Sequence, residues 1–303
     1  MSASLRQISL GTNAAAEDAV GLILERELGQ APSAYTDVRT GTITVSVYFQ
    51  LADEEITTVK RQLRAALSEL KEDGVDPAPG QIRIRRVRPQ DWSESWKRHF
   101  KPLDFGRALL VKPTWSTRKP RAGQQVVLLD PGMSFGTGQH ATTHFCLEQL
   151  IACRTPGKTK SLLDAGTGSG ILAIAAAKLG YRPVQAIDFD PDCLRITAEN
   201  AALNGVSDLV RSYAADVTKL PKRATEKFDV ICANLIYDLL ISERDRLLVR
   251  LAAGGELIVA GILATQFPQV QAALEAAGMK LLVAKTRKEW RSGRFRREHR
   301  SVD

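Results

Sequence analysis

A glycine-rich turn contains the residues best suited to holding a ligand. It lies in the stretch LLDAGTGSGI at residues 162–171, between an apolar run and a helical pattern. Ligands of open α/β sheets bind outside the carboxyl ends of the strands, where glycines let the backbone approach them. A dinucleotide loop has the spacing Gly-x-Gly-x-x-Gly, whereas the third glycine here comes one residue earlier, at Gly170. The turn, with Gly166 and Gly168, therefore favours S-adenosylmethionine, which has no pyrophosphate.

Two acidic residues follow this turn at the ends of later apolar runs. Asp188 ends the second predicted strand, and a carboxylate there accepts hydrogen bonds from both hydroxyls of a ribose. The alternative is a cap on the next helix, a role that Asp190 suits better because it directly precedes Pro191. Asp216, just after the third strand, is expected to contact an adenine, with a cap or turn role as its alternative.

Two further stretches are expected near the same ligand. In LDPGMSFGTGQHATT, at residues 129–143, glycines and a proline exclude a regular element, while Thr142 and Thr143 open an apolar helix. Such a loop is suited to lie over the carboxylate of a ligand. In ANLI, at residues 233–236, Asn234 stands at the carboxyl end of the fourth predicted strand, beside the expected reaction centre. Its side-chain oxygen suits an amine donor, and its alternative is a cap on a helix expected from Leu235.

These residues need an element pattern that brings strand ends together. From Ser161 onward, strands and helices alternate, which predicts a parallel sheet in a doubly wound α/β fold. Helices are expected to begin near Gly170, Pro191, Leu235 and Thr265. The predicted strands are Ser161–Ala165, Val184–Asp188, Leu209–Tyr213, Phe228–Ala233, Glu256–Ala260 and Lys280–Ala284.

The front of the chain has a different pattern, in the order β-α-β-β-α-β. This order is that of a small ferredoxin-like α+β unit, for which docking or dimerisation is the expected role. Its predicted elements are Leu5–Leu10, Ala14–Leu28 ending at Gly29, Tyr35–Arg39, Thr42–Phe49, Asp53–Leu70 and Gln81–Val87. The next stretch, Arg88–Pro102, mixes proline, charges and two tryptophans, and is expected to be a linker or a short helix. Trp92 and Trp96 are one helical turn apart, which favours a packing stripe over a substrate contact.

Taken together, these stretches resemble the PrmA family, the bacterial methyltransferases of large-subunit ribosomal protein eleven. The resemblance rests on DPGMSFGTGQHATT, LDAGTGSGILAIAAAKLG, IDFDPDCLRITAENAALNG and ANLI, and it covers residues 82–261 well. It implies a seven-stranded, Rossmann-like methyltransferase domain at residues 104–303. It also implies a linker at residues 88–103 and an N-terminal domain at residues 1–87 that docks the ribosomal protein.

The resemblance also implies a reaction and its site. The reaction is methylation of α-amino and lysine ε-amino groups by S-adenosylmethionine, with Asn234 as the catalytic residue. Three features depart from the family pattern: Gln139, the order Leu235-Ile236, and the strongly basic tail RSGRFRREHR. The cofactor contacts that it implies are Thr143, Gly166, Asp188 and Asn234, to which the turn itself adds Gly168 and the third strand Asp216.

The charge distribution leaves other functions open. Residues 1–75 hold 7 Lys/Arg against 11 Asp/Glu, residues 76–125 hold 12 against 4, and residues 276–303 hold 9 against 3. Most charge runs are solvated surface. The alternative interpretation is that the acidic residues 1–75 face a basic partner and that the two basic segments face RNA. Contact with nucleic acid is thus compatible but not required. An RNA methyltransferase and an inactive RNA-binding protein with this fold are the alternatives.

The remaining features exclude several classes of protein. No apolar run of about 18 residues predicts a membrane span, and the N-terminus does not have the pattern of a signal peptide. His140 and His144 have the spacing of half a metal site, but Ala141 stands where a zinc hydrolase needs glutamate, so no metal is expected. The four cysteines form no CxxC pair and indicate reduced residues of a cytoplasmic protein. They are Cys146, Cys153, Cys193 and Cys232.

Overall fold

The computed structural model describes residues 4–29, 32–36, 42–87, 101–130 and 140–297. They belong to two compact units, Met1–His99 and Phe100–Asp303. Both Trp92 and Trp96, and the loop at residues 131–139, lie outside the described residues. In the part of the chain that is described, no helix is both long and apolar enough to cross a membrane.

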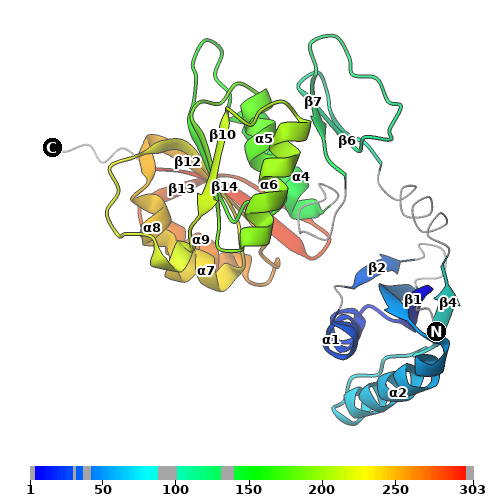
Figure 1. The fold of residues 1–303 in the computed structure, drawn as a ribbon. Helices are drawn as coiled ribbons and strands as arrows, with labels where there is room; N and C mark the ends of the chain where they lie inside the picture. Colours follow the sequence, from blue (N-terminus) through cyan, green and yellow to red (C-terminus); the bar gives the residue numbers. More distant parts are fainter. Residues whose placement is uncertain (1–3, 30–31, 37–41, 88–100, 131–139, 298–303) are drawn as a thin grey trace. The chain divides into compact units, whose positions relative to one another are not determined.

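The first unit packs two helices against a four-stranded antiparallel sheet of order β2-β3-β1-β4 (Figure 1). Alternate residues of the strands, such as Ile8 and Leu10, are fully buried, and they form one core with the apolar residues of the two helices. The first helix stops at Gly29, which has a left-handed φ of 64°, as its sequence predicts. The elements are β1 (Ser4–Thr12), α1 (Glu17–Leu28), β2 (Ser33–Thr36), β3 (Ile43–Leu51), η1 (Asp53–Glu55), α2 (Ile56–Glu72) and β4 (Ile82–Arg86).

The second unit is built on a large mixed sheet of order β10-β9-β8-β11-β12-β14-β13. The strands from β10 to β12 run parallel, and β14 runs antiparallel to both of its neighbours. The six predicted strands are all present, most of them within two residues of their predicted ends. Their bounds are β8 (Leu162–Ala165), β9 (Val184–Asp188), β10 (Val210–Ala214), β11 (Phe228–Asn234), β12 (Leu251–Ala260), β13 (Met279–Arg287) and β14 (Trp290–Arg297).

Helices cover both faces of this sheet, as a doubly wound α/β fold requires (Figure 1). Successive strand residues are buried in opposite cores, because side chains alternate along a strand. In β8, for example, Leu162 packs with the first group of helices and Leu163 with the second. The first group comprises α4 (Ala141–Ala152), α5 (Ile171–Lys178) and α6 (Pro191–Leu203); the second comprises α7 (Tyr237–Ser242), α8 (Arg244–Leu248) and α9 (Phe267–Ala276).

Most of the basic tail, up to Arg297, is a strand of this sheet. Glu256, on β12, is 4% exposed and pairs with Arg296 at 2.9 Å and Arg294 at 3.1 Å, both on β14. The Arg291 guanidinium lies 4.9 Å from the ring centre of Phe267. These arginines therefore hold β14 in the sheet rather than forming a free basic tail.

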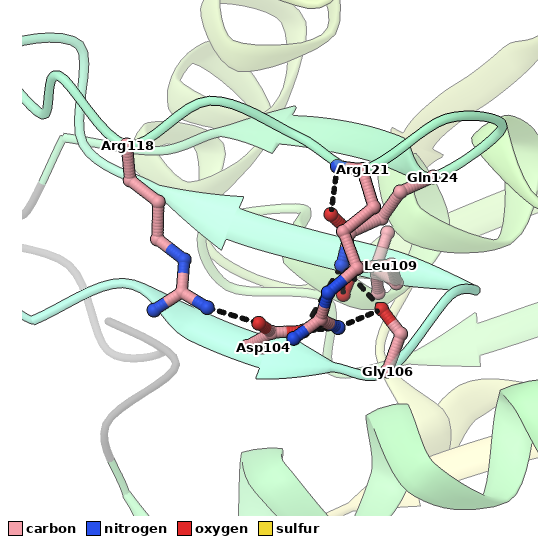
Figure 2. A network of polar contacts seen from close by, with 6 residues as sticks. All are labelled: Asp104, Gly106, Leu109, Arg118, Arg121 and Gln124. Carbon is pink, nitrogen blue, oxygen red and sulfur yellow. Dashed lines mark hydrogen bonds and ion pairs between the residues drawn. The ribbon is translucent and has the colours of Figure 1, made fainter.

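A small sheet of order β5-β6-β7 occupies the segment before α4, where no strand was predicted. Figure 2 shows its polar network, in which Asp104 accepts hydrogen bonds from Arg118, Arg121 and Gln124. Two arginines of the basic stretch at residues 76–125 are thus paired within the unit. The strands are β5 (Leu103–Phe105), β6 (Leu109–Lys112) and β7 (Gln125–Leu128).

Candidate active site

The sheet brings the expected site residues to one edge. β8 lies between β9 and β11, with Ala165 in register with Ile187 on one side and with Ala233 on the other. Asp188 and Asn234, each one residue further on, therefore flank the glycine turn that leaves β8. This edge is formed by the carboxyl ends of parallel strands, which is where ligands of such sheets bind.

The glycine turn is fixed by hydrogen bonds and by close packing. The N–H groups of Gly166 and Thr167 both donate to the carbonyl of Ile187, at 2.9 and 3.0 Å. Gly166 has φ of 74°, and a Cβ there would lie 2.5 Å from Cδ2 of Leu235. A side chain at this position would be strained, and the Leu235 side chain would have to move to admit it. The turn consequently presents bare backbone at the strand edge.

Asp188 is 7% exposed and connects the turn to the next helix. Its carboxylate accepts hydrogen bonds from the N–H of Gly168 at 2.9 Å and the N–H of Asp190 at 3.1 Å. The cap of α6 is Asp190, which accepts from the N–H of Asp192, so the capping alternative for Asp188 is wrong. Each oxygen of Asp188 keeps a further lone pair with which to accept from a ligand.

Asp164 is a buried acid that the sequence interpretation missed. One of its oxygens accepts from the Thr167 hydroxyl at 2.7 Å and from the Ala173 N–H at 3.2 Å. The other oxygen, Oδ1, is buried without a partner among the described residues. Burial raises the pKa of this carboxyl from 3.8 to about 6, and the charge of Asp188 adds to the effect. An acid inside the otherwise apolar run Leu162–Ala165 was the signal that could have identified it.

Thr143 lies in the first turn of α4 and is 1% exposed. Its hydroxyl has no hydrogen-bond partner in the described part of the chain, although buried hydroxyls are normally paired. The loop that precedes this helix, residues 131–139, lies outside the described residues. Thr143 therefore has hydrogen-bonding capacity available for a ligand.

The two histidines of α4 have structural contacts. His140 caps α4, with Nδ1 2.7 Å from the Thr142 hydroxyl, and its ring packs edge-on against Trp290. His144 packs against Phe105, and its Nδ1 lies 3.4 Å from Glu148. Burial lowers the pKa of both imidazoles. No group of three or more His, Cys, Asp or Glu among the described residues is arranged to hold a metal ion.

Asp216 already has a local role, which is that of a cap. It precedes η2 (Val217–Lys219), and its carboxylate accepts from the N–H and the hydroxyl of Thr218 at 2.9 and 2.7 Å. These hydrogen bonds, and the ammonium of Lys219, lower the pKa of the carboxyl. Its contact with adenine stays a prediction.

Asn234 is the last residue of β11 and does not cap the next helix. That helix, α7, begins two residues later than predicted, at Tyr237, with Ile236 as an N-cap residue that provides no side-chain hydrogen bond. The capping alternative for Asn234 is therefore wrong. Its half-buried amide stands at the same edge as Asp188, and its role in catalysis stays a prediction.

Comparison with known proteins identifies the family. A model of the ribosomal protein L11 methyltransferase (PrmA) family matches residues 4–298. The ribosomal protein L11 methyltransferase of Geobacter sulfurreducens is 39% identical over 257 residues, covering 85% of this chain and 83% of its own length. That of Agathobacter rectalis is 35% identical over 257 residues, covering 82% of this chain and 79% of its own length.

A solved structure supports the same assignment. The ribosomal protein L11 methylase of Lactobacillus delbrueckii subsp. bulgaricus superposes with a TM-score of 0.58 at 32% identity, covering 66% of this chain and all of its own. The α/β methyltransferase fold with a large mixed sheet is confirmed by this match, and so is the resemblance drawn from the motifs. The chain belongs to the ribosomal protein L11 methyltransferase (PrmA) family.

Proposed function

We propose that the chain transfers methyl groups from S-adenosylmethionine to α-amino and lysine ε-amino groups of a large-subunit ribosomal protein. Its relatives are named for ribosomal protein L11, which is the substrate proposed here. The observation that carries the proposal is the placement of Asp188 and Asn234 on either side of the strand that leads into the glycine turn. With the roles proposed for them, Asp188 would accept from the ribose and Asn234 from the amine at this edge.

The polar groups around the turn fit S-adenosylmethionine. Asp188 would accept from the ribose hydroxyls, and the bare backbone of Gly166 and Gly168 would allow close approach. The hydroxyl of Thr143, which lacks a partner among the described residues, would gain one from the ligand, as a buried polar group normally has. Asp216 is assigned to the adenine. When bound, S-adenosylmethionine supplies an electrophilic methyl carbon on a positively charged sulfur.

Asn234 is proposed to orient both the cofactor and the accepting amine. The amine must be neutral to attack, because an ammonium has no lone pair, and a lysine amine has a reference pKa of about 10.4. An amide oxygen accepts a hydrogen bond from the neutral amine without the charge that would hold an ammonium. Alignment of amine, methyl carbon and sulfur then supplies much of the rate enhancement.

We assign the N-terminal unit, at residues 1–87, as a ferredoxin-like domain that docks the ribosomal protein. Its β-α-β-β-α-β order and its strand order β2-β3-β1-β4 support the ferredoxin-like assignment, and its excess of acidic residues suits a basic protein partner. A linker would follow, and the methyltransferase domain with its seven-stranded sheet would begin at Leu103, where β5 starts, one residue before the boundary expected at Asp104. The enzyme is assigned to the cytoplasm, where its substrate would be encountered.

Nucleic acid contact is compatible with this reaction but not required by it. The described cations without an ion pair include Arg154, Lys158 and Lys160, which line a hollow of about 630 Å³ before β8. This hollow lies at the opposite end of β8 from the glycine turn. RNA bound there would be remote from the reaction edge, so it would act as a guide and not as the methyl acceptor.

Labelled S-adenosylmethionine, incubated with the protein and with separated ribosomal components, tests the proposal. We expect label in one large-subunit protein. Label in RNA alone would support the RNA methyltransferase instead. Cofactor binding without any transfer would support the inactive RNA-binding alternative.

A further inference from the structure

Gly261 stands at the reaction edge, directly after β12 and beside Asn234. Asn234 is in register with Ala260, and the N–H of Leu235 donates to the carbonyl of Ala260 at 3.1 Å. The end of β11 and the residue after it are therefore hydrogen-bonded to the end of β12. Gly261 has φ of 82°, a left-handed conformation that glycine adopts without strain.

The space at Gly261 is closed by the residues that follow β11. A Cβ built there would lie 2.7 Å from the carbonyl oxygen of Leu235 and 3.1 Å from Oδ1 of Asn234. Ordinary van der Waals contact begins near 3.4 Å. The nearest atom is the backbone oxygen of Leu235, and the N–H of Leu235 is hydrogen-bonded to β12. Rotation of a side chain would therefore not relieve the close contact with a new Cβ. The strain would pass to the Asn234–Leu235 segment.

The same segment is held from the other side by the glycine turn. Cδ2 of Leu235 occupies the space in which a Cβ of Gly166 would lie, at 2.5 Å. Leu235 thus fits between two glycines, one in the turn after β8 and one after β12. Asn234 directly precedes Leu235, and the missing side chain at Gly261 leaves the space in which Oδ1 of Asn234 stands.

We propose that Gly261 is a positioning residue for methyl transfer, which acts by leaving room for Asn234 and Leu235. The inference rests on the proposed role of Asn234 in the reaction. Gly261 touches neither amine nor cofactor in this scheme. It determines the placement of the amide that orients the amine, and misplacement of a reacting group by about 1 Å can cost about a hundredfold in rate.

A left-handed backbone alone would also require glycine here, and the chain contains a matched control for that effect. Gly278, before β13, has φ of 81°, but a Cβ there would meet nothing within 4 Å. Gly261→Ala and Gly278→Ala therefore carry the same conformational strain. They differ in whether the new methyl group crowds Asn234.

The test measures kcat, KM for the ribosomal protein and cofactor affinity in both variants of the full-length enzyme. For Gly261→Ala we expect kcat to fall about tenfold or more, with KM and cofactor affinity within about twofold, since alignment affects the transition state most. Gly278→Ala should lose less thermal stability, because its Cβ meets nothing within 4 Å, and it should keep kcat. Equal kcat in the two variants would overturn the proposal.

Asparagine provides a second pair of variants, because it tolerates the left-handed region better than alanine. Gly261→Asn keeps the crowding Cβ with less backbone strain, and thermal unfolding of both pairs of variants shows which are folded before their kcat values are compared. We expect Gly261→Asn to lose kcat as well, whereas Gly278→Asn should not. Wild-type kcat in Gly261→Asn would refute the crowding argument.

Combination with Asn234→Ala separates the two proposals. If Gly261 acts through Asn234, then Gly261→Ala should slow the Asn234→Ala enzyme by less than about twofold, because coupled residues are not additive. An undiminished effect in that background would overturn the positioning role. Full turnover in Asn234→Ala alone would instead overturn the proposed role of Asn234.

Discussion

The N–H of Gly168 donates a hydrogen bond of 2.9 Å to the carboxylate of Asp188. Through this contact the turn after β8 is tied to the end of β9, so the backbone that would face the cofactor is ordered by the acid that would bind its ribose. Loss of this carboxylate would remove a ligand contact and a loop contact together.

Asp188→Ala should weaken S-adenosylmethionine binding by about 1.5–3 kcal/mol, since a charged acceptor is removed from the ribose hydroxyls. Calorimetry measures the effect directly. The matched control is Asp190→Ala, which removes the cap of α6; it should cost about 1 kcal/mol of stability and leave the affinity nearly unchanged. A folded Asp188→Ala enzyme with wild-type affinity would disprove the ribose assignment.

Asn234→Ala should lower kcat markedly while changing substrate affinity less. Because Asn234 does not cap α7, the free energy of unfolding of the Asn234→Ala enzyme should differ from that of the wild type by no more than about 0.5 kcal/mol. Asn234→Asp should also be slow at neutral pH, because a carboxylate would hold the amine as ammonium. Steady-state kinetics and urea unfolding of the same preparations check both statements. Full activity of Asn234→Asp at neutral pH would remove Asn234 from the mechanism.

Asp164 should make stability depend on pH. Its carboxyl has a pKa of about 6 in the folded chain, above the 3.8 of the unfolded chain. Its protonated form therefore stabilises the fold fully below about pH 4, and that contribution is lost as the pH rises through 6. The stability advantage of wild type over Asp164→Asn should fall by roughly 2 kcal/mol between pH 4 and pH 7. Urea unfolding with the same difference at both pH values would contradict this.

A chain shortened to begin at Lys101 should still bind S-adenosylmethionine but should lose methylation of the intact ribosomal protein. The cut must leave β5 whole, because Asp104 is the acceptor for Arg118 and Arg121. Calorimetry and a transfer assay measure the two activities separately. The docking role is wrong if the shortened enzyme methylates that protein at the full rate. Salt should weaken docking in the full-length enzyme, since exposed charges are screened over about 10 Å at 0.1 M.

The strands and helices that frame the site were predictable from the sequence because their signals are local. Apolar runs with glycine turns placed β8 and β9, and Asp190 before Pro191 marked the start of α6. The end of β11 was less predictable. Leu235 and Ile236 precede α7, and the N–H of Leu235 donates to the carbonyl of Ala260 on the neighbouring strand, a tertiary contact that no local pattern contains.

The last strand and the buried acid were missed for a related reason. In β14, arginines are interspersed with Ser292, Gly293 and Phe295. From the sequence alone, this stretch resembles a solvated basic tail. Burial of Glu256 on β12 is what makes the arginines favourable in the sheet, and their pairing partner is about forty residues away in sequence. Asp164 lies within an apolar strand, and only the tertiary structure shows that one of its oxygens has no partner in the described part of the chain.

We propose that this enzyme methylates amines of a ribosomal protein at the edge formed by β8, β9 and β11. The decisive experiment is mass spectrometry of purified large-subunit ribosomal protein L11 after incubation with the enzyme and S-adenosylmethionine. We expect methyl groups on the α-amine and on lysine ε-amines, absent when Asn234→Ala replaces the wild type for the same short time. Unmodified amines after prolonged incubation with a wild-type enzyme that binds the cofactor would contradict it.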